Sequence, residues 1–201
     1  MVIGVSGVAG SGKDTFFKIF QDLLGEREVK RFALATSLKR EAGDWTIPHY
    51  GIDPLNCTRQ EKEIIRPFLV FHGVSKRRES RGRHWIDKLN NEVLPFKDSE
   101  ELAVVTDIRY AEHEKDEIYW LKEELNGVLV HISTYTAVAD HNEGALLLKF
   151  LPPANGEESR NDSTLKARAD YVLEWPRIEE GLDVREELRP YVERFVNKIN
   201  I

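Results

Sequence analysis

The chain has 201 residues, a formal net charge of −6 and 41% hydrophobic residues, which predicts one globular α/β domain with a substantial core. The acidic balance argues against general nucleic-acid binding, and no apolar run approaches the roughly 20 residues that a membrane helix needs. Since Cys57 is the only cysteine and no signal peptide is apparent, we expect a location in the cytoplasm, or in the host cytoplasm if the source is viral.

The chain opens with a short buried strand over residues 2–5, a glycine-rich loop and an amphipathic helix. Gly7, Gly10 and Gly12 let the loop turn tightly and bring backbone N–H groups close to an anion. Lys13 adds a positive charge at the place where the following helix points the positive end of its dipole. A flexible turn would explain the glycines alone, but this order of elements predicts a P-loop that holds the phosphates of a nucleotide. The residues expected to bind the nucleotide are Gly7, Gly10, Ser11, Gly12, Lys13, Asp14 and Thr15.

The residue after Lys13 departs from the strict P-loop pattern. The strict pattern has Ser or Thr there, whose hydroxyl binds Mg²⁺, but this chain has Asp14 and places Thr15 one residue later. Asp14 could orient a magnesium-bound water, or Thr15 could supply the hydroxyl. Asp14 also suits the first turn of a helix on dipole grounds alone, so the sequence leaves the metal ligand open.

Strands and helices alternate along the rest of the chain. Strands are predicted over residues 28–33, 102–107, 128–133 and 171–174. Helices are predicted over residues 34–45, 58–72, 84–93, 111–125 and 184–199, and a loop over residues 46–57. Asp183 and Glu186 have capping-box spacing before the last helix, which Pro190 is expected to kink or restart. The alternation predicts a three-layer α/β/α sandwich with a mainly parallel sheet of about five strands.

Two further segments stand out by composition. Residues 134–169 are polar and punctuated by Pro152, Pro153 and Gly156, so they form either a lid or a plain surface excursion. Residues 76–83 carry five basic side chains against one acidic side chain, which indicates a local anion site or a solvated loop.

Asp107 and Arg109 follow a predicted apolar strand. Phosphoryl transfer needs a carboxylate that organises the metal and cations that neutralise the moving phosphoryl group. Asp107 ends the strand where a carboxylate would face the nucleotide, and Arg109 near the same edge can grip a phosphate. The plainer alternatives are a turn cap for Asp107 and a surface salt bridge for Arg109. The candidate metal ligands are Asp107, Asp14 and Thr15.

Three segments of the sequence resemble the motifs of one known protein family. The first is the Gly-Lys-Asp-Thr ending of the loop, residues 12–15. The second is Arg66-Pro67-Phe68-Leu69 with Gly73, Arg78 and Trp85, and the third is Asp107-Ile108-Arg109-Tyr110. Weaker similarities are Phe32-Ala33 with Lys39, and Ala169-Asp170-Tyr171-Val172. Together these segments resemble the deoxynucleoside monophosphate kinases of phages and some bacteria, a family of P-loop kinases.

The resemblance implies transfer of the γ-phosphoryl group of ATP to a (deoxy)nucleoside monophosphate, with Mg²⁺ as cofactor. It implies a single kinase domain over residues 1–201, in which the helical region 46–95 binds the acceptor. The residues implied in catalysis are Lys13, Arg78 and Arg109; those implied in acceptor binding are Lys39, Arg66, Arg78, Trp85 and Arg109; and the implied lid cations are Arg160 and Arg168. Trp85 would pack against the acceptor base, but an aromatic residue on a helix face is more often part of the core, and we favour the core.

The chain also departs from this family. Where the family often has Gln-x-x-Gly-Thr-Glu, this chain has Val70 and then Gly73-Val74-Ser75, so polar groups that could distinguish a base are missing. Lys76 and Arg77 add charge that could replace those contacts. The base and sugar preference therefore stays open, as does the formation of a homodimer. The alternatives are another small-molecule P-loop kinase, acting on a coenzyme precursor or a phosphorylated metabolite, and a nucleotide-binding module without transfer activity.

Overall fold

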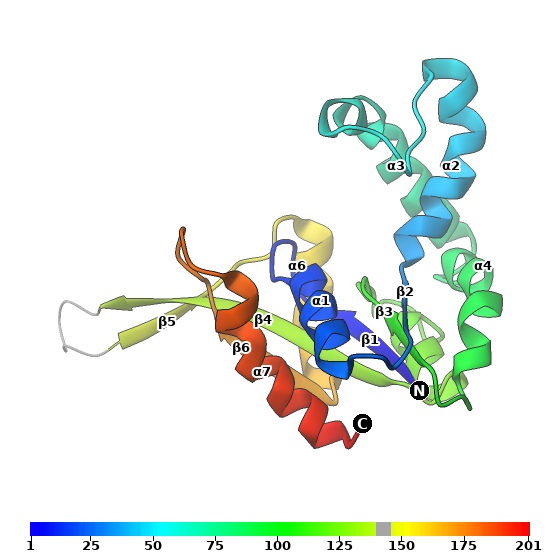
Figure 1. Cartoon of the computed structure of the whole chain (residues 1–201). Coiled ribbons are helices and arrows are strands. Elements are labelled where there is room, and N and C mark those ends of the chain that lie inside the picture. Colours follow the sequence, from blue (N-terminus) through cyan, green and yellow to red (C-terminus); the bar gives the residue numbers. More distant parts are fainter. Residues whose placement is uncertain (140–145) are drawn as a thin grey trace.

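The computed structural model describes residues 1–139 and 146–201, and a six-stranded sheet lies at its centre (Figure 1). β2, β3, β1 and β4 lie side by side in that order and run parallel, and β6 is parallel to β4 on its other side. β5 runs antiparallel to the end of β4. The strands are β1 Val2–Ser6, β2 Val29–Phe32, β3 Leu102–Val105, β4 Val128–Ala139, β5 Leu146–Phe150 and β6 Tyr171–Pro176. The predicted mainly parallel sheet is confirmed.

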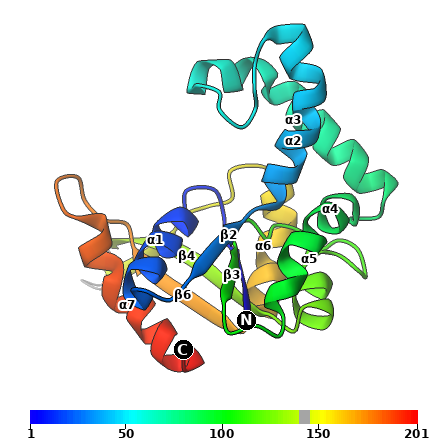
Figure 2. The same ribbon diagram turned by 45° about the vertical axis from the view of Figure 1, so that its right-hand side comes forward.

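Helices cover both faces of the sheet (Figure 2). They are α1 Lys13–Leu24 and α7 Val184–Ile199 on one face, and α4 His84–Val93, α5 Glu117–Tyr119 and α6 Gly156–Arg168 on the other. Phe16, Phe20 and Phe195 join α1 to α7 with ring centroids 5.5 to 6.0 Å apart. On the opposite face, Trp120 in the π-helical turn after α5 is fully buried with Leu89 of α4. The predicted three-layer α/β/α sandwich is therefore confirmed.

Two helices, α2 (Leu34–Tyr50) and α3 (Arg59–Glu79), project from the C-terminal edge of the sheet as a helical arm (Figures 1 and 2). The arm has a small apolar cluster of its own, made of Ala42, Ile52, Ile65 and Leu69. Glu41 of α2 ties the arm to α4, because its carboxylate lies 2.8 Å from His72, 2.9 Å from His84 and 2.8 Å from Lys88. Burial alone would raise the pKa of Glu41, but the bonds from Lys88 and His84 hold it at about 2.

The two arm helices are longer than the sequence predicted. The predicted helix end at residue 45 is wrong, because Pro48 lies in the last turn and Gly51, at φ +67°, donates its N–H to the carbonyl of Ile47. The predicted end of α3 at residue 72 is also wrong. The basic residues 76–78 form its last turn, where the helix dipole favours cations, so residues 76–79 are helix rather than loop.

Three other predictions need correction. The helix predicted from residue 111 begins only at Glu117, because the Asp116 carboxylate accepts N–H bonds from Glu112 and His113 and holds this segment as a loop. α7 is continuous from Val184 to Ile199, so it does not restart at Pro190, and a kink there stays a prediction. In the candidate lid 134–169, β4 continues, β5 pairs with it and α6 follows, while residues 140–145 lie outside the described residues. Among the residues with assigned structure, no helix is both long and apolar enough to cross a membrane.

Candidate active site

The glycine-rich loop between β1 and α1 is held in a tight turn against the sheet. Gly7 and Gly12 have φ values of +132° and +89°, in the range that favours glycine. A Cβ at Gly7 would lie 2.4 Å from the carbonyl oxygen of Ile132, and a Cβ at Gly12 would lie 2.7 Å from the Trp175 ring. The loop conformation therefore depends on glycine at both positions.

Two residues that sequence analysis missed hold this loop from below. The carbonyl of Ser11 accepts hydrogen bonds from the hydroxyl of Thr134 on β4, at 2.9 Å, and from the indole Nε1 of Trp175 on β6, at 3.1 Å. Trp175 Nε1 also lies 2.8 Å from the Thr134 hydroxyl. A preorganised loop loses little conformational entropy when it binds an anion.

Lys13 and Arg109 bring two positive charges to the same edge of the sheet. The ammonium of Lys13 donates to the carbonyl oxygens of Gly7 and Val8, at 2.8 and 2.9 Å. Burial, followed by the repulsion of the nearby Arg109, lowers the pKa of Lys13. Two cations this close favour a ligand with several negative charges, such as a chain of phosphates.

A carboxylate from α6 lies at the loop. Both carboxylate oxygens of Glu158 lie 3.2 Å from the backbone nitrogen of Ala9, which donates to them. One of these oxygens also accepts the N–H of Ala154 at 2.9 Å, so Glu158 links the start of α6 to the phosphate loop. The carboxylate of Glu158 thus already accepts a hydrogen bond from one N–H group of the loop, that of Ala9.

His131 on β4 lies behind the loop and is buried. Its Nδ1 lies 3.1 Å from the hydroxyl of Ser6 at the end of β1. Burial, and then the ammonium groups of Lys166 and Lys13, lower the pKa of His131 to about 4. His131 is therefore neutral near pH 7 and adds no charge beside Lys13.

The three candidate metal ligands lie near the loop, in different settings. Asp14 is exposed and forms an ion pair with Arg31, while Thr15 is half-buried in the first turn of α1. Asp107 accepts the N–H groups of Leu34 and Ala35, at 2.8 and 2.9 Å, so it caps the start of α2. Among residues 1–139 and 146–201, no three His, Cys, Asp or Glu side chains form a group that could hold a metal ion by themselves. These carboxylates fit Mg²⁺ that arrives with a nucleotide, since Mg²⁺ in such sites is held mostly by phosphates and water.

The loop that carries Arg109 is fixed by a buried acid. One carboxylate oxygen of Glu117 accepts the N–H groups of Arg109 and Tyr110, at 2.6 and 3.0 Å. Burial, and then the neighbouring Asp116, raise the pKa of Glu117 to about 8. Glu117 therefore sets the backbone position of Arg109 from beneath.

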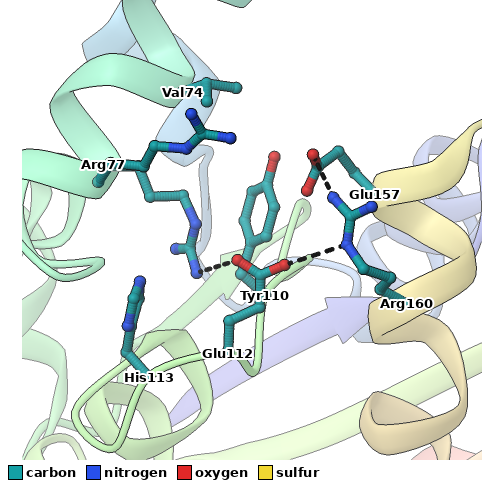
Figure 3. Close-up of a pocket in the computed structure, with 8 residues that line it drawn as sticks. Val74, Arg77, Tyr110, Glu112, His113, Glu157 and Arg160 are labelled. Carbon is teal, nitrogen blue, oxygen red and sulfur yellow. Dashed lines mark ion pairs between the residues drawn. The ribbon is translucent and has the colours of Figure 1, made fainter.

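A pocket of about 120 Å³ lies beside this loop, between α3 and α6 (Figure 3). Its lining residues are Val74, Arg77, Arg78, Tyr110, Glu112, His113, Glu157 and Arg160. Arg78 and Arg160, which the sequence assigned to the acceptor site and the lid, thus line one pocket. Glu112 bridges its two sides, with carboxylate oxygens 3.5 Å from Arg77 and 3.8 Å from Arg160 (Figure 3).

Arg77 forms the floor of this pocket. Its guanidinium is buried, donates to both carboxylate oxygens of Asp116, one at 2.7 Å, and lies 3.8 Å from the centre of the Tyr110 ring. From the sequence, Arg77 was expected only to add charge that could replace the missing polar contacts, and Glu112 and Glu157 were not identified. The basic composition of residues 76–83 was the only feature of the sequence that could have indicated a role for Arg77.

No protein-family model and no curated protein sequence matches the chain. Among solved structures, the dephospho-CoA kinase from Campylobacter jejuni aligns over 100% of this chain and 98% of its own, at 15% identity and a TM-score of 0.50. Shikimate kinases from Bacteroides thetaiotaomicron and Acinetobacter baumannii also align over 100% of this chain, and over 99% and 94% of their own. They are 13% and 17% identical, with TM-scores of 0.46 and 0.44. The chain has the P-loop kinase fold.

Three of the predicted site residues are not among those that line the pocket. Arg66 is twelve positions before Arg78 on α3, about 18 Å along the helix, and pairs with Glu63. Lys39 is half-buried on α2. Arg168 is exposed at the end of α6, about 15 Å from Glu158, whose end of the helix meets the loop. The roles of all three stay predictions.

Trp85 belongs to the core. It is 8% exposed, packs in the apolar cluster beneath the sheet and donates from Nε1 to the carbonyl of Gly73 at 3.2 Å. This is the setting that the sequence analysis favoured over stacking on a base.

Proposed function

We propose that the protein is a kinase that uses ATP and Mg²⁺ to phosphorylate a (deoxy)nucleoside monophosphate. The observation that carries the proposal is the placement of two sites for anions along one edge of the sheet. Lys13 and the P-loop suit the phosphates of ATP, and the neighbouring pocket with Arg78 and Arg160 suits the phosphate of an acceptor. Arg109 lies near Lys13, where its positive charge can interact with the phosphates at both sites.

In this reaction an oxygen of the acceptor phosphate attacks the γ-phosphorus of ATP. The bond between that phosphorus and the β–γ bridging oxygen breaks, and ADP leaves with the electron pair. The N–H groups of the P-loop and Lys13 hold the phosphates of ATP in line with the acceptor. Arg78 and Arg109 offset the negative charge of the two reactants, which would otherwise repel each other.

A bound Mg²⁺ ion supplies charge neutralisation on the outer phosphates. Asp14, Thr15 and Asp107 are the residues that would hold it, directly or through water. Asp107 also caps α2. A shift of this carboxylate toward a metal would therefore weaken its hydrogen bonds to Leu34 and Ala35 at the base of the helical arm.

A second candidate is a small-molecule kinase with a different acceptor, such as a phosphorylated coenzyme precursor. The pocket favours it in one respect, because Glu112 and Glu157 stand beside the two arginines. Carboxylates there suit an acceptor that also presents hydroxyl or amino groups. The P-loop would have the same role in both candidates.

The test measures ADP release from ATP and Mg²⁺ with a panel of deoxy- and ribonucleoside monophosphates. Turnover with one or a few of them is expected. ATP binding without turnover on any member would overturn the nucleotide acceptor, and the panel would then move to phosphorylated coenzyme precursors.

Arg78→Ala then locates the acceptor site. We expect kcat/KM for the acceptor to fall about 100-fold, because a charged phosphate contact is lost, with the Kd for ATP unchanged. Arg59→Ala, at the exposed opposite end of α3, is the matched control and should leave both unchanged. Equal loss of turnover and ATP binding in Arg78→Ala would contradict the assignment of the pocket.

A further inference from the structure

The hairpin of β4 and β5 presents apolar side chains to solvent. Tyr135 to Ala139 of β4 pair with Phe150 to Leu146 of β5, and the hairpin extends beyond the helical layers (Figure 1). In β5, Leu146 is 71% exposed, Leu147 56%, Leu148 50% and Phe150 38%. Because side chains alternate along a strand, Leu146, Leu148 and Phe150 share one face, and exposed apolar side chains gathered on one face mark an interaction site.

The outer edge of β5 is open. Within the described part of the chain, β5 pairs only with β4. The N–H of Leu151 donates to Thr134 of β4 at 2.8 Å, and backbone groups alternate between the two sides of a strand. The N–H and C=O groups of Leu146, Leu148 and Phe150 therefore point away from β4.

Edge strands of this kind are usually protected. Charged side chains, prolines or bulges prevent them from pairing with another strand. β5 has no proline and a single charge, Lys149, although the chain as a whole carries a net charge of −6. With four apolar residues and one charge, this edge is suited to a partner strand that is also mostly apolar.

We propose that β5 pairs with β5 of a second copy of this chain, antiparallel about a two-fold axis at Leu148. In this register Leu148 lies opposite the partner subunit's Leu148, Leu146 opposite the partner's Phe150, and Leu147 opposite the partner's Lys149. Leu146, Leu148 and Phe150 meet apolar residues on one face, and Lys149 lies opposite a leucine rather than another lysine, so like charges do not meet, as a favourable two-fold contact requires. Two hairpins become one four-stranded sheet, which is more stable than an isolated two-stranded hairpin.

Sedimentation equilibrium of the purified full chain tests the proposal. We expect a mass of twice 23.2 kDa at high concentration, with a Kd in the micromolar range because the contact is small. Leu148→Lys places two ammonium groups directly opposite each other and should raise this Kd at least about 10-fold. Val138→Lys is the matched control, since Val138 is 45% exposed on the same hairpin but lies on β4, away from the outer edge. A wild-type chain that stays monomeric up to about 200 µM, or equal effects of both variants, would overturn the proposal.

Cross-linking tests the register independently. Directly opposite residues of a hydrogen-bonded antiparallel pair have Cα atoms about 5.5 Å apart, within the range of a disulfide. In a Cys57→Ser background, Leu148→Cys should give a covalent dimer on mild oxidation, and Val138→Cys should not. Far-UV circular dichroism checks that each variant is folded. Absence of the Leu148→Cys dimer, or equal cross-linking of both variants, would refute this register.

Discussion

Glu158 of α6 and Ala9 of the P-loop are in contact, with both carboxylate oxygens of Glu158 3.2 Å from the Ala9 nitrogen. The N–H groups of a P-loop are the donors that hold the phosphates of a nucleotide. A carboxylate and a phosphate cannot share one donor at close range, since their charges repel. The Glu158 contact and nucleotide binding are therefore in competition, and we expect the Glu158 side chain to leave Ala9 when a nucleotide binds.

Glu158→Gln should raise the affinity for ATP. The change removes one negative charge beside the phosphates and keeps the shape of the side chain, so we expect the Kd for ATP to fall about 5-fold. Isothermal titration calorimetry measures it. Glu123→Gln is the control, because Glu123 is exposed and the substitution changes the net charge equally. An unchanged or weaker affinity in Glu158→Gln would mean that Glu158 does not compete with the nucleotide.

Removal of Arg77 should destabilise the protein. Arg77 and Asp116 are both buried and joined by two hydrogen bonds; burial alone would raise the pKa of Asp116, but the bonds from Arg77 keep it lowered. Arg77→Met leaves the buried charge of Asp116 without its cation and should lower the free energy of unfolding by about 3 kcal/mol. Adding Asp116→Asn removes that charge and should recover part of the loss. Urea denaturation measures both, and a double variant less stable than Arg77→Met would contradict this account.

Glu117 should make stability depend on pH in an unusual direction. Its pKa is about 8 in the folded protein, mainly through burial, against 4.5 in an exposed carboxyl group. Between these values the folded state holds a proton that the unfolded state releases, so the free energy of unfolding should fall as pH rises from 4.5 to 8. Glu117→Gln keeps an acceptor for the N–H of Arg109 and removes the titration, so its stability should fall less steeply over this range. Urea denaturation at several pH values compares the slopes, and equal slopes would show that Glu117 ionises normally.

The sequence was sufficient for the features that depend on neighbours along the chain. The P-loop is one, because Gly7, Gly12 and Lys13 lie within a few residues of each other. Contacts beside the pocket and at the P-loop join residues that are distant in sequence: Arg77 and Asp116 are 39 residues apart, and Glu158 is 149 residues from Ala9. No local pattern indicates such contacts, since they follow from the packing of α3 against α2 and α4 and of α6 against the sheet.

Arg77 and Arg78 show that the sequence alone did not indicate which of two neighbouring side chains is buried. The resemblance to a kinase family singled out Arg78, but the fold buries Arg77, because adjacent residues on a helix point about 100° apart. The basic composition of residues 76–83 indicated an anion site without indicating which side chain faces the core. That choice depends on the rotation of α3 about its axis, which is set by its contacts with α2 and α4.

Gly12→Ala should weaken both stability and ATP binding. Gly12 has φ +89°, and a Cβ there would lie 2.7 Å from the Trp175 ring that holds the loop. Backbone strain of about 1 kcal/mol and the steric overlap together should lower the free energy of unfolding by about 3 kcal/mol. Displacement of Trp175 would also loosen the hydrogen bond to Ser11 and raise the Kd for ATP.

Gly51→Ala separates the two contributions to this loss. Gly51 has a similar left-handed conformation, φ +67°, but nothing lies within 4 Å of a Cβ at that position. It should lose only the strain of about 1 kcal/mol and keep the affinity for ATP. Urea denaturation and calorimetry compare the two variants. If Gly12→Ala costs no more than Gly51→Ala, Trp175 moves aside without cost, and the indole does not hold the phosphate loop in place.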